Sequence, residues 1–149
     1  MSDSFAASVT AWARQSEARL TAVRNRSIDL LAEEMSNTIP NGGRVPFDTG
    51  FLARSIVAST QGMPRASQSP SPGGEVGLIT ASLRLDQPVW LGYTANYARR
   101  VNFGFIGADS LGRVYNQSGA HFIEGAIAEW QNIVRRAAAE LQNSVESRA

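Results

Sequence analysis

The chain has 149 residues, of which 43% are hydrophobic and 18% are charged. This balance is typical of a globular protein, it excludes wholesale disorder, and the length suits a single domain over residues 1–149. Fourteen basic and thirteen acidic residues leave a net charge of +1, without the concentrated basic patch of a DNA-binding domain. Cysteine is absent, which excludes disulfides and thiolate metal sites.

No stretch of the sequence is apolar over the roughly 18 residues that a membrane-spanning helix needs. The first residues, Met1–Ser4, show neither the basic nor the apolar region of a signal peptide. We therefore expect a chain without a membrane partner that is made in a cytoplasm.

A long amphipathic helix is predicted over about residues 4–35. Apolar side chains recur there at steps of three or four, at Phe5, Val9, Trp12, Leu20, Val23 and Leu30. Thirty-two residues would span about 50 Å, which is longer than a small domain needs. We expect this helix to pack against a neighbouring subunit as well as its own core. The alternative is a bend or break near residues 24–27.

The segment 44–56 is predicted to form a corner between two structural halves. Pro46 fixes its own φ, and Gly50 can adopt dihedrals closed to other residues. The side chains of Asp48 and Thr49 can bond to nearby backbone amides and brace the turn. Apolar anchors then return the chain to the core, namely Phe51, Leu52 and Ile56.

Three strands are predicted after the corner, at residues 55–60, 75–80 and 88–93, with the last two as antiparallel neighbours. Residues 61–74 contain three prolines and almost no apolar side chains, which predicts a flexible loop. We expect this loop to be disordered in a free monomer and ordered by a neighbour in an assembly.

The last third of the chain is predicted to end in a second long helix. Residues 96–101 indicate one or two helical turns, and 111–115 indicate a short strand within a glycine-rich region. Over residues 121–145, a heptad-like apolar seam predicts one amphipathic helix. The predicted fold class is α+β, with two long helices packed against a small twisted antiparallel β-sheet, and with long loops.

The sharpest enzymatic candidate is the tripeptide Asp48-Thr49-Gly50, which also occurs at the active site of aspartic proteases. Two such carboxylates sharing a proton would perform general acid–base catalysis, and a homodimer could supply the second copy. However, Phe51 follows the glycine where those enzymes place a small residue. A turn motif is the simpler interpretation.

Other residues give weaker signals of chemistry. His121 is the single histidine, and its place before Phe122 predicts a role in starting a helix or in packing. A base-stacking platform would need basic neighbours, which only Arg99 and Arg100 near Tyr97 offer. We therefore predict no catalytic residues, no cofactor and no metal site.

Three segments together resemble the head–tail connector and tail-completion (neck) proteins of long-tailed double-stranded DNA bacteriophages. They are residues 45–56 (VPFDTGFLARSI), 91–104 (LGYTANYARRVNFG) and 121–130 (HFIEGAIAEW). The family shows a Pro-Val-Asp-Thr-Gly corner, a Tyr-Ala-x-x-Val-Glu-x-Gly segment and a Phe-led start to the last helix. This chain departs from it with Phe47 for a smaller aliphatic residue and Asn102 for glutamate.

The resemblance implies a structural virion protein of the neck or tail that assembles in the host cytoplasm as a homo-oligomeric ring, with hexamers expected. Its partners would be the phage adaptor or connector and the tail-tube proteins, and DNA would pass transiently through its lumen. The residues that carry the motif would form a structural corner and interface: Pro46, Asp48, Thr49, Gly50, Leu52, Ser55, Ile56, Tyr97, Gly104 and Phe122.

Three alternatives stay open. The ring could be a tail terminator that stops polymerisation of the tail tube. The chain could be a retropepsin-like protease that uses Asp48. It could also be a small nucleic-acid-binding or regulatory protein, which its charge balance disfavours.

Overall fold

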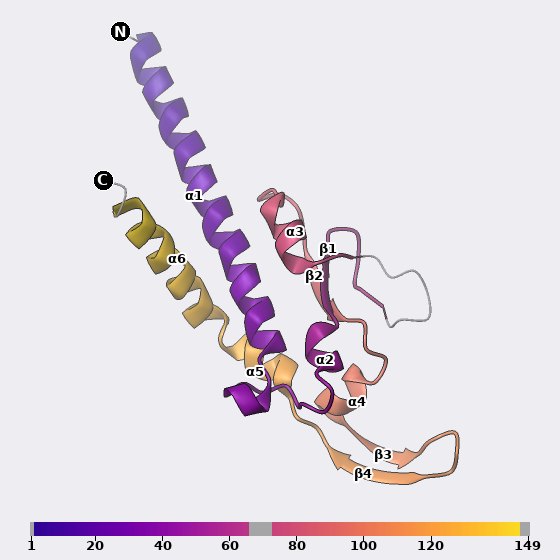
Figure 1. The fold of residues 1–149 in the computed structure, drawn as a ribbon. Coiled ribbons are helices and arrows are strands. Elements are labelled where there is room, and N and C mark those ends of the chain that lie inside the picture. Colours follow the sequence, from indigo (N-terminus) through magenta and orange to yellow (C-terminus); the bar gives the residue numbers. More distant parts are fainter. Residues whose placement is uncertain (1, 66–72, 147–149) are drawn as a thin grey trace.

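The computed structural model describes residues 2–65 and 73–146 and has the expected α+β fold (Figure 1). Its helices are α1 (Ser2–Ser36), the 3-10 helix η1 (Ile39–Asn41), α2 (Phe51–Arg54), α3 (Val76–Ala81), α4 (Ala98–Phe103), α5 (Phe122–Ala128) and α6 (Trp130–Glu146). Its strands are β1 (Ile56–Ser59), β2 (Trp90–Tyr93), β3 (Gly104–Ala108) and β4 (Val114–Ser118).

Helix α1 is the longest element, and α6 runs antiparallel along part of it (Figure 1). Leu30 of α1 is buried together with Ile133 and Ala137 of α6. The helix predicted from the apolar spacing is confirmed. It continues without a break at residues 24–27, where the buried hydroxyl of Ser27 donates to the carbonyl oxygen of Val23 at 2.6 Å.

The strands form two separate two-stranded antiparallel sheets where a single small sheet was expected. Strands β1 and β2 pair with Ile56 opposite Tyr93, so the strands predicted at 55–60 and 88–93 are confirmed. Strands β3 and β4 form a hairpin that projects from the opposite end of the molecule to the start of α1 (Figure 1). The strand predicted at 111–115 lies at Val114–Ser118, and its partner β3 was not predicted.

The strand predicted at residues 75–80 is wrong, because this segment forms α3. Short apolar runs do not distinguish a strand from a buried helical turn by their periodicity. The helical conformation places the Thr80 hydroxyl where it donates to the Asp29 carboxylate of α1 at 2.6 Å. This segment thus has a contact with α1, distant in the sequence, that local periodicity does not report.

The single helix predicted over 121–145 is interrupted at Glu129, where α5 ends and α6 follows. The amide of Glu129 donates to the carbonyl oxygen of Ala126, a tighter spacing than in an α-helix. The interruption lets the two helices bury different faces. Helix α5 buries Phe122 in the main core, whereas α6 buries Ile133 against α1.

The loop predicted at 61–74 falls partly on residues 66–72, which lie outside the described residues. The described residues at its two ends contact strands β1 and β2. Pro64 is buried beside Gly92 of β2, and Gly74 exchanges two backbone hydrogen bonds with Ala58, at 2.8 and 2.9 Å. The expectation of a flexible loop therefore does not hold for Pro64 and Gly74.

The main core lies where the corner, β2 and α5 meet the end of α1. Its buried members are Met35, Val45, Leu52, Ala53, Tyr93, Ala95, Ala98, Phe122 and Ala126. The rings of Tyr93 and Phe122 meet edge to face, with centroids 5.3 Å apart. None of the helices in the described part of the chain is both long and apolar enough to cross a membrane.

The hydroxyl of Tyr93 donates to the Met35 carbonyl oxygen at 2.7 Å, inside this core. Met35 lies in the last turn of α1, where carbonyl groups have no partner within the helix. Burial raises the pKa of Tyr93, so this hydroxyl stays protonated and keeps its proton for the bond.

We predict that Tyr93→Phe lowers the free energy of unfolding by about 1–3 kcal/mol, because the buried Met35 carbonyl loses its partner. The aromatic ring and its contact with Phe122 are kept. Urea unfolding followed by circular dichroism measures the change. Tyr97→Phe, at a more exposed tyrosine, is the matched control and should change the free energy by less than about 0.5 kcal/mol. Equal losses in both variants would contradict the assignment.

Candidate functional site

The corner and α4 together form a cleft of about 250 Å³. Its lining residues are Pro46, Phe47, Asp48, Thr49, Gly50, Phe51, Leu52, Tyr97 and Val101. Six of the ten residues expected to form an interface motif thus lie together here: Pro46, Asp48, Thr49, Gly50, Leu52 and Tyr97. We call this the corner cleft.

Gly50 sets the conformation of the corner. Its φ of 79° is in the left-handed region, which side-chain-bearing residues rarely adopt. A Cβ atom there would lie 2.8 Å from Nη1 of Arg54 and 2.9 Å from Cε2 of Phe47. The chain therefore needs glycine at this point to enter α2 and to let Phe47 fold back over the backbone.

The two polar residues of the corner differ in their contacts. The Thr49 hydroxyl accepts from the amide of Phe51 at 3.4 Å, and its carbonyl oxygen accepts from the guanidinium of Arg54 at 3.3 Å. Asp48 is exposed, and within the described part of the chain its carboxylate has no hydrogen bond or ion pair. The expected bracing of the turn thus comes from Thr49 and not from Asp48.

Three aromatic side chains give the corner cleft an apolar, accessible surface. Phe47, Phe51 and Tyr97 are all exposed by more than a third of their area. The rings of Phe51 and Tyr97 lie 6.3 Å apart. Large exposed apolar side chains gathered in one patch are typical of a surface that contacts another protein.

The other four expected motif residues lie away from the cleft. Ser55 and Phe122 are buried, and Ile56 packs against the main core, so these three support the fold. Gly104 ends α4 with a φ of 84°, and a Cβ atom there would lie 2.4 Å from the Gln117 carbonyl oxygen. Gly104 therefore allows the close approach of the two strands at the base of the hairpin.

Asn102 connects α4 to the start of α5 and is fully buried. Its side-chain oxygen accepts from the Ile123 amide at 2.9 Å, and its amide group donates to both Glu124 carboxylate oxygens at 3.0 Å. His121 precedes α5 in a left-handed conformation, which agrees with its predicted role in starting a helix. Sequence reasoning noted Asn102 only as a departure from the family pattern.

Hydrogen bonding also determines the acidity of Glu124. A bond from its own backbone N–H is the largest influence, and the bonds from Asn102 add to it. These contacts outweigh desolvation and hold the pKa of Glu124 below its ordinary value of 4.5. The carboxylate is therefore fitted to act as an ionised acceptor at the start of α5.

Arg100, one of the two basic residues near Tyr97, stacks on a different aromatic side chain. The guanidinium of Arg100 lies 4.2 Å from the ring centroid of Phe105 in β3. Phe105 in turn contacts Tyr115 across the hairpin, with centroids 6.0 Å apart. Arg100 thus holds the hairpin against α4 by a cation–π contact.

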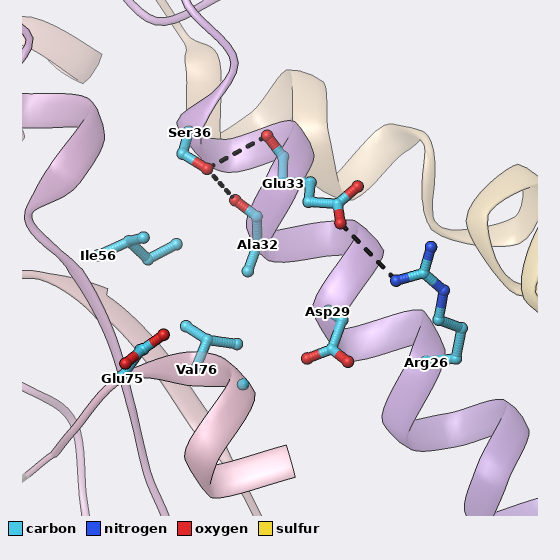
Figure 2. Close-up of a pocket in the computed structure, with 9 residues that line it drawn as sticks. Arg26, Asp29, Ala32, Glu33, Ser36, Ile56, Glu75 and Val76 are labelled. Atoms are coloured by element: carbon cyan, nitrogen blue, oxygen red, sulfur yellow. Dashed lines mark hydrogen bonds and ion pairs between the residues drawn. The ribbon is translucent and has the colours of Figure 1, made fainter. Parts of the chain in front are cut away.

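A second cleft of about 340 Å³ lies between α1 and the start of α3 (Figure 2). It contains the carboxylates of Asp29, Glu33 and Glu75, together with Arg26 and Ile56. Within the described residues, no group of three histidine, cysteine or acidic side chains is placed to hold a metal ion.

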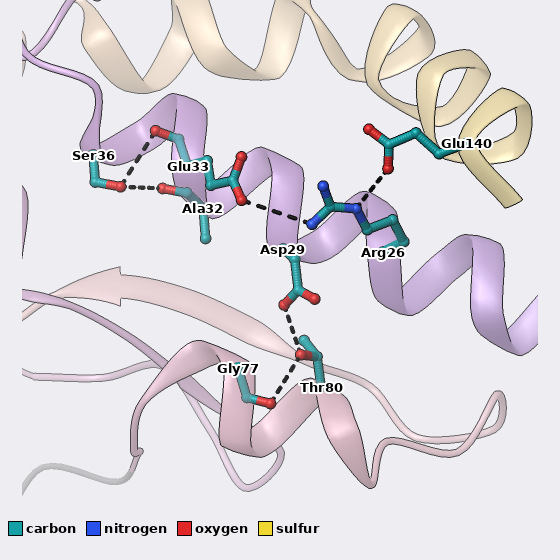
Figure 3. A network of polar contacts seen from close by, with 8 residues as sticks. All are labelled: Arg26, Asp29, Ala32, Glu33, Ser36, Gly77, Thr80 and Glu140. Carbon is teal, nitrogen blue, oxygen red and sulfur yellow. Dashed lines mark hydrogen bonds and ion pairs between the residues drawn. The ribbon is translucent and has the colours of Figure 1, made fainter. Parts of the chain in front are cut away.

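The polar groups of this second cleft link helices to one another (Figure 3). Asp29 accepts from Thr80 of α3, and Nε of Arg26 donates to Glu140 of α6 at 2.8 Å. Arg26 also pairs with Glu33 at 3.7 Å. The spacing of residues 26, 29 and 33 on one side of α1 is the sequence signal that could have revealed this network.

A comparison with known proteins finds no family model, no curated protein and no solved structure that matches this chain. The functional argument therefore depends on the residues and their geometry.

We predict that Gly50→Ala lowers the free energy of unfolding by about 1–2 kcal/mol, because alanine is strained at this φ. Urea unfolding measures the loss. Gly77→Ala is the matched control, since Gly77 lies in α3 with open space where the Cβ would go. That variant should be unchanged or more stable by up to about 1 kcal/mol. Similar behaviour of both variants would refute a special conformation at Gly50.

A second prediction concerns pH. Because folding lowers the pKa of Glu124, its ionised form contributes stability that is fully present above about pH 4.5 and is lost as the pH falls through the folded pKa. We expect the difference in free energy of unfolding between the wild type and Glu124→Gln to be largest at pH 7 and to shrink as the pH falls below 4.5. Denaturant titrations at each pH measure both values. A difference that is constant with pH would contradict the assignment.

Proposed function

We propose that this chain is a structural subunit of a bacteriophage neck. Copies of it form a ring at the head–tail junction, join the portal–adaptor complex to the tail tube and keep the DNA channel continuous. One observation carries the proposal. The three segments that resemble the connector and tail-completion family lie far apart in the sequence, yet they supply every buried member of the main core except Met35.

The contacts between these segments are specific. Tyr93 from the second segment meets Phe122 from the third, and Ile56 from the first pairs with Tyr93 across the sheet. Asn102 from the second segment bonds to Ile123 and Glu124 in the third. A resemblance spread over three segments is thus one structural unit, which supports a common architectural role for them.

The surface also suits assembly. In the proposed ring, the exposed aromatic residues of the corner cleft would contact the neighbouring subunit or the adjoining adaptor and tube proteins. The near-balance of fourteen basic and thirteen acidic residues suits a channel through which DNA must pass without strong attachment. Tight, salt-dependent binding of duplex DNA to the purified ring would count against this role.

The central prediction is that the purified protein forms closed, sixfold rings. Light scattering coupled to size-exclusion chromatography measures the mass of the assembly, and negative-stain imaging shows its shape. Within particles, the ring should lie at the neck. A chain that stays monomeric at all concentrations and is absent from the neck would disprove the proposal.

Two further experiments separate the connector role from the terminator and protease alternatives. The first examines particles that lack the protein, and the second replaces Asp48. Loss of a connector leaves tails of normal length unjoined to heads, whereas loss of a terminator gives overlong tubes. Asp48→Asn, at an exposed position without a partner among the described residues, should leave the free energy of unfolding within about 0.5 kcal/mol of the wild type. If this variant assembles fully and supports particle formation, a protease role for Asp48 is excluded.

A further inference from the structure

The first part of α1 is an arm that lies apart from the rest of the structure and extends past the described end of α6 (Figure 1). Phe5 and Trp12 are 73% and 68% exposed, and Val9 between them is also exposed. No charged residue occurs from Ser4 to Ala13. A helical segment that faced only water would carry charged side chains on its outer surface.

The exposed side chains of the arm belong to an apolar stripe of α1 that is exposed as far as Leu20, which is 59% exposed, and that packs with α6 only at Val23 and Leu30. The steps from Phe5 to Val9 and on to Trp12 are four and three residues, as in the buried part of the stripe that ends at Leu30. The arm therefore presents a helix-binding face along the part of α1 that extends past the described end of α6 (Figure 1).

A groove that could receive such an arm lies beside it, between α1 and α6. It has a volume of about 630 Å³. Its lining residues are Gln15, Ala18, Arg19, Ala22, Val23, Ala138, Leu141 and Gln142. Three alanines on two facing helices leave a hollow between the backbones, and Arg19 is its single charged residue.

We propose that the arm of one copy docks in the α1/α6 groove of a second copy, with Phe5, Val9 and Trp12 inserted beside the alanines. One chain carries both halves of this contact: large protruding side chains on the arm and a hollow lined by small ones. An uncharged arm also enters the groove without burying an unpaired charge of its own.

The accessible surface that this docking would bury agrees with an interface between copies. Aromatic side chains bury roughly 150–250 Å² each, so an arm and its groove would each lose on the order of 400 Å² of accessible surface. A subunit that both gives and receives an arm then reaches the roughly 800 Å² per partner of a standard interface. Docking on a lipid surface is less favoured, because helices that lie in membrane interfaces carry Lys or Arg on their polar face.

The inference rests on the proposed function only in expecting copies of the chain to associate. The first test compares the wild type with Phe5→Ser/Trp12→Ser by analytical ultracentrifugation. The dissociation constant should rise at least roughly 30-fold, because two central aromatic anchors are lost. The urea midpoint of the monomer, measured at protein concentrations well below the dissociation constant, should be unchanged, because both side chains are exposed within one chain. Leu78→Ser, at a 70% exposed residue of α3, is the matched control and should associate like the wild type.

The second test uses the absence of cysteine from the chain. A copy with Val9→Cys and a differently tagged copy with Ala138→Cys are mixed and mildly oxidised. The proposal expects a mixed disulfide between the two copies. Replacing the second variant with Leu78→Cys should abolish it.

The outcomes separate this inference from the proposed function. Rings that form equally well with Phe5→Ser/Trp12→Ser would support the neck role and overturn the docking site. Arm-dependent dimers that never close into rings would support the docking site and contradict the neck role. A chain that stays monomeric, or one whose arm binds phosphatidylcholine vesicles while remaining monomeric, would overturn the docking site as well.

Discussion

The carboxyl-terminal end of α1 is the point on which the fold depends. A helix leaves its last carbonyl groups without internal partners, and here two other segments of the chain bond to carbonyl groups at or just beyond the helix end. Tyr93 donates to the carbonyl of Met35, and the amides of Arg44 and Val45 donate to that of Asn37 just beyond the helix. The sheet strand β2 and the corner are thereby fixed to one helix end.

Charge strengthens the same junction. The guanidinium of Arg44 lies 2.5 Å from the Glu34 carboxylate in α1 and 3.5 Å from that of Glu129, where α5 gives way to α6. The side chain crosses α5 at Gly125, where a Cβ atom would lie 2.4 Å from Cδ of Arg44. One residue of the corner therefore ties the long helix to the break between the last two helices.

Features of the fold could be predicted from the sequence where the residues that determine them are close together in the chain. The apolar period of α1 and the Pro and Gly signals of the corner are local, and both were found. The conformation of α3 depends on Asp29, which is far away in the sequence, so a local reading predicted a strand. Strand β3 of the hairpin was missed because its apolar residue Ile106 is exposed, which removes the usual alternation between buried and solvated faces.

The residues of the candidate site likewise divide into those indicated by local sequence signals and those whose partners lie far away in the sequence. Pro46, Asp48, Thr49, Gly50 and Leu52 line one cleft because the turn chemistry that relates them is local, whereas Tyr97 was placed with them only through the family resemblance. The role of Asn102 depends on partners that follow it by about twenty residues, so no local pattern indicated it. Ser55, Ile56 and Phe122 belong to the same motif but support the fold from within.

Helix α1 has a buried carboxyl-terminal part and an exposed amino-terminal arm. This difference has a consequence for how such a chain can change during evolution. Seven residues are close to two helical turns, so inserting or removing seven in the arm rotates its face by only about 20°. The core at Met35 would not be disturbed. The reach of the arm can thus adapt to partners of different dimensions, while the globular part keeps its sequence and its stability.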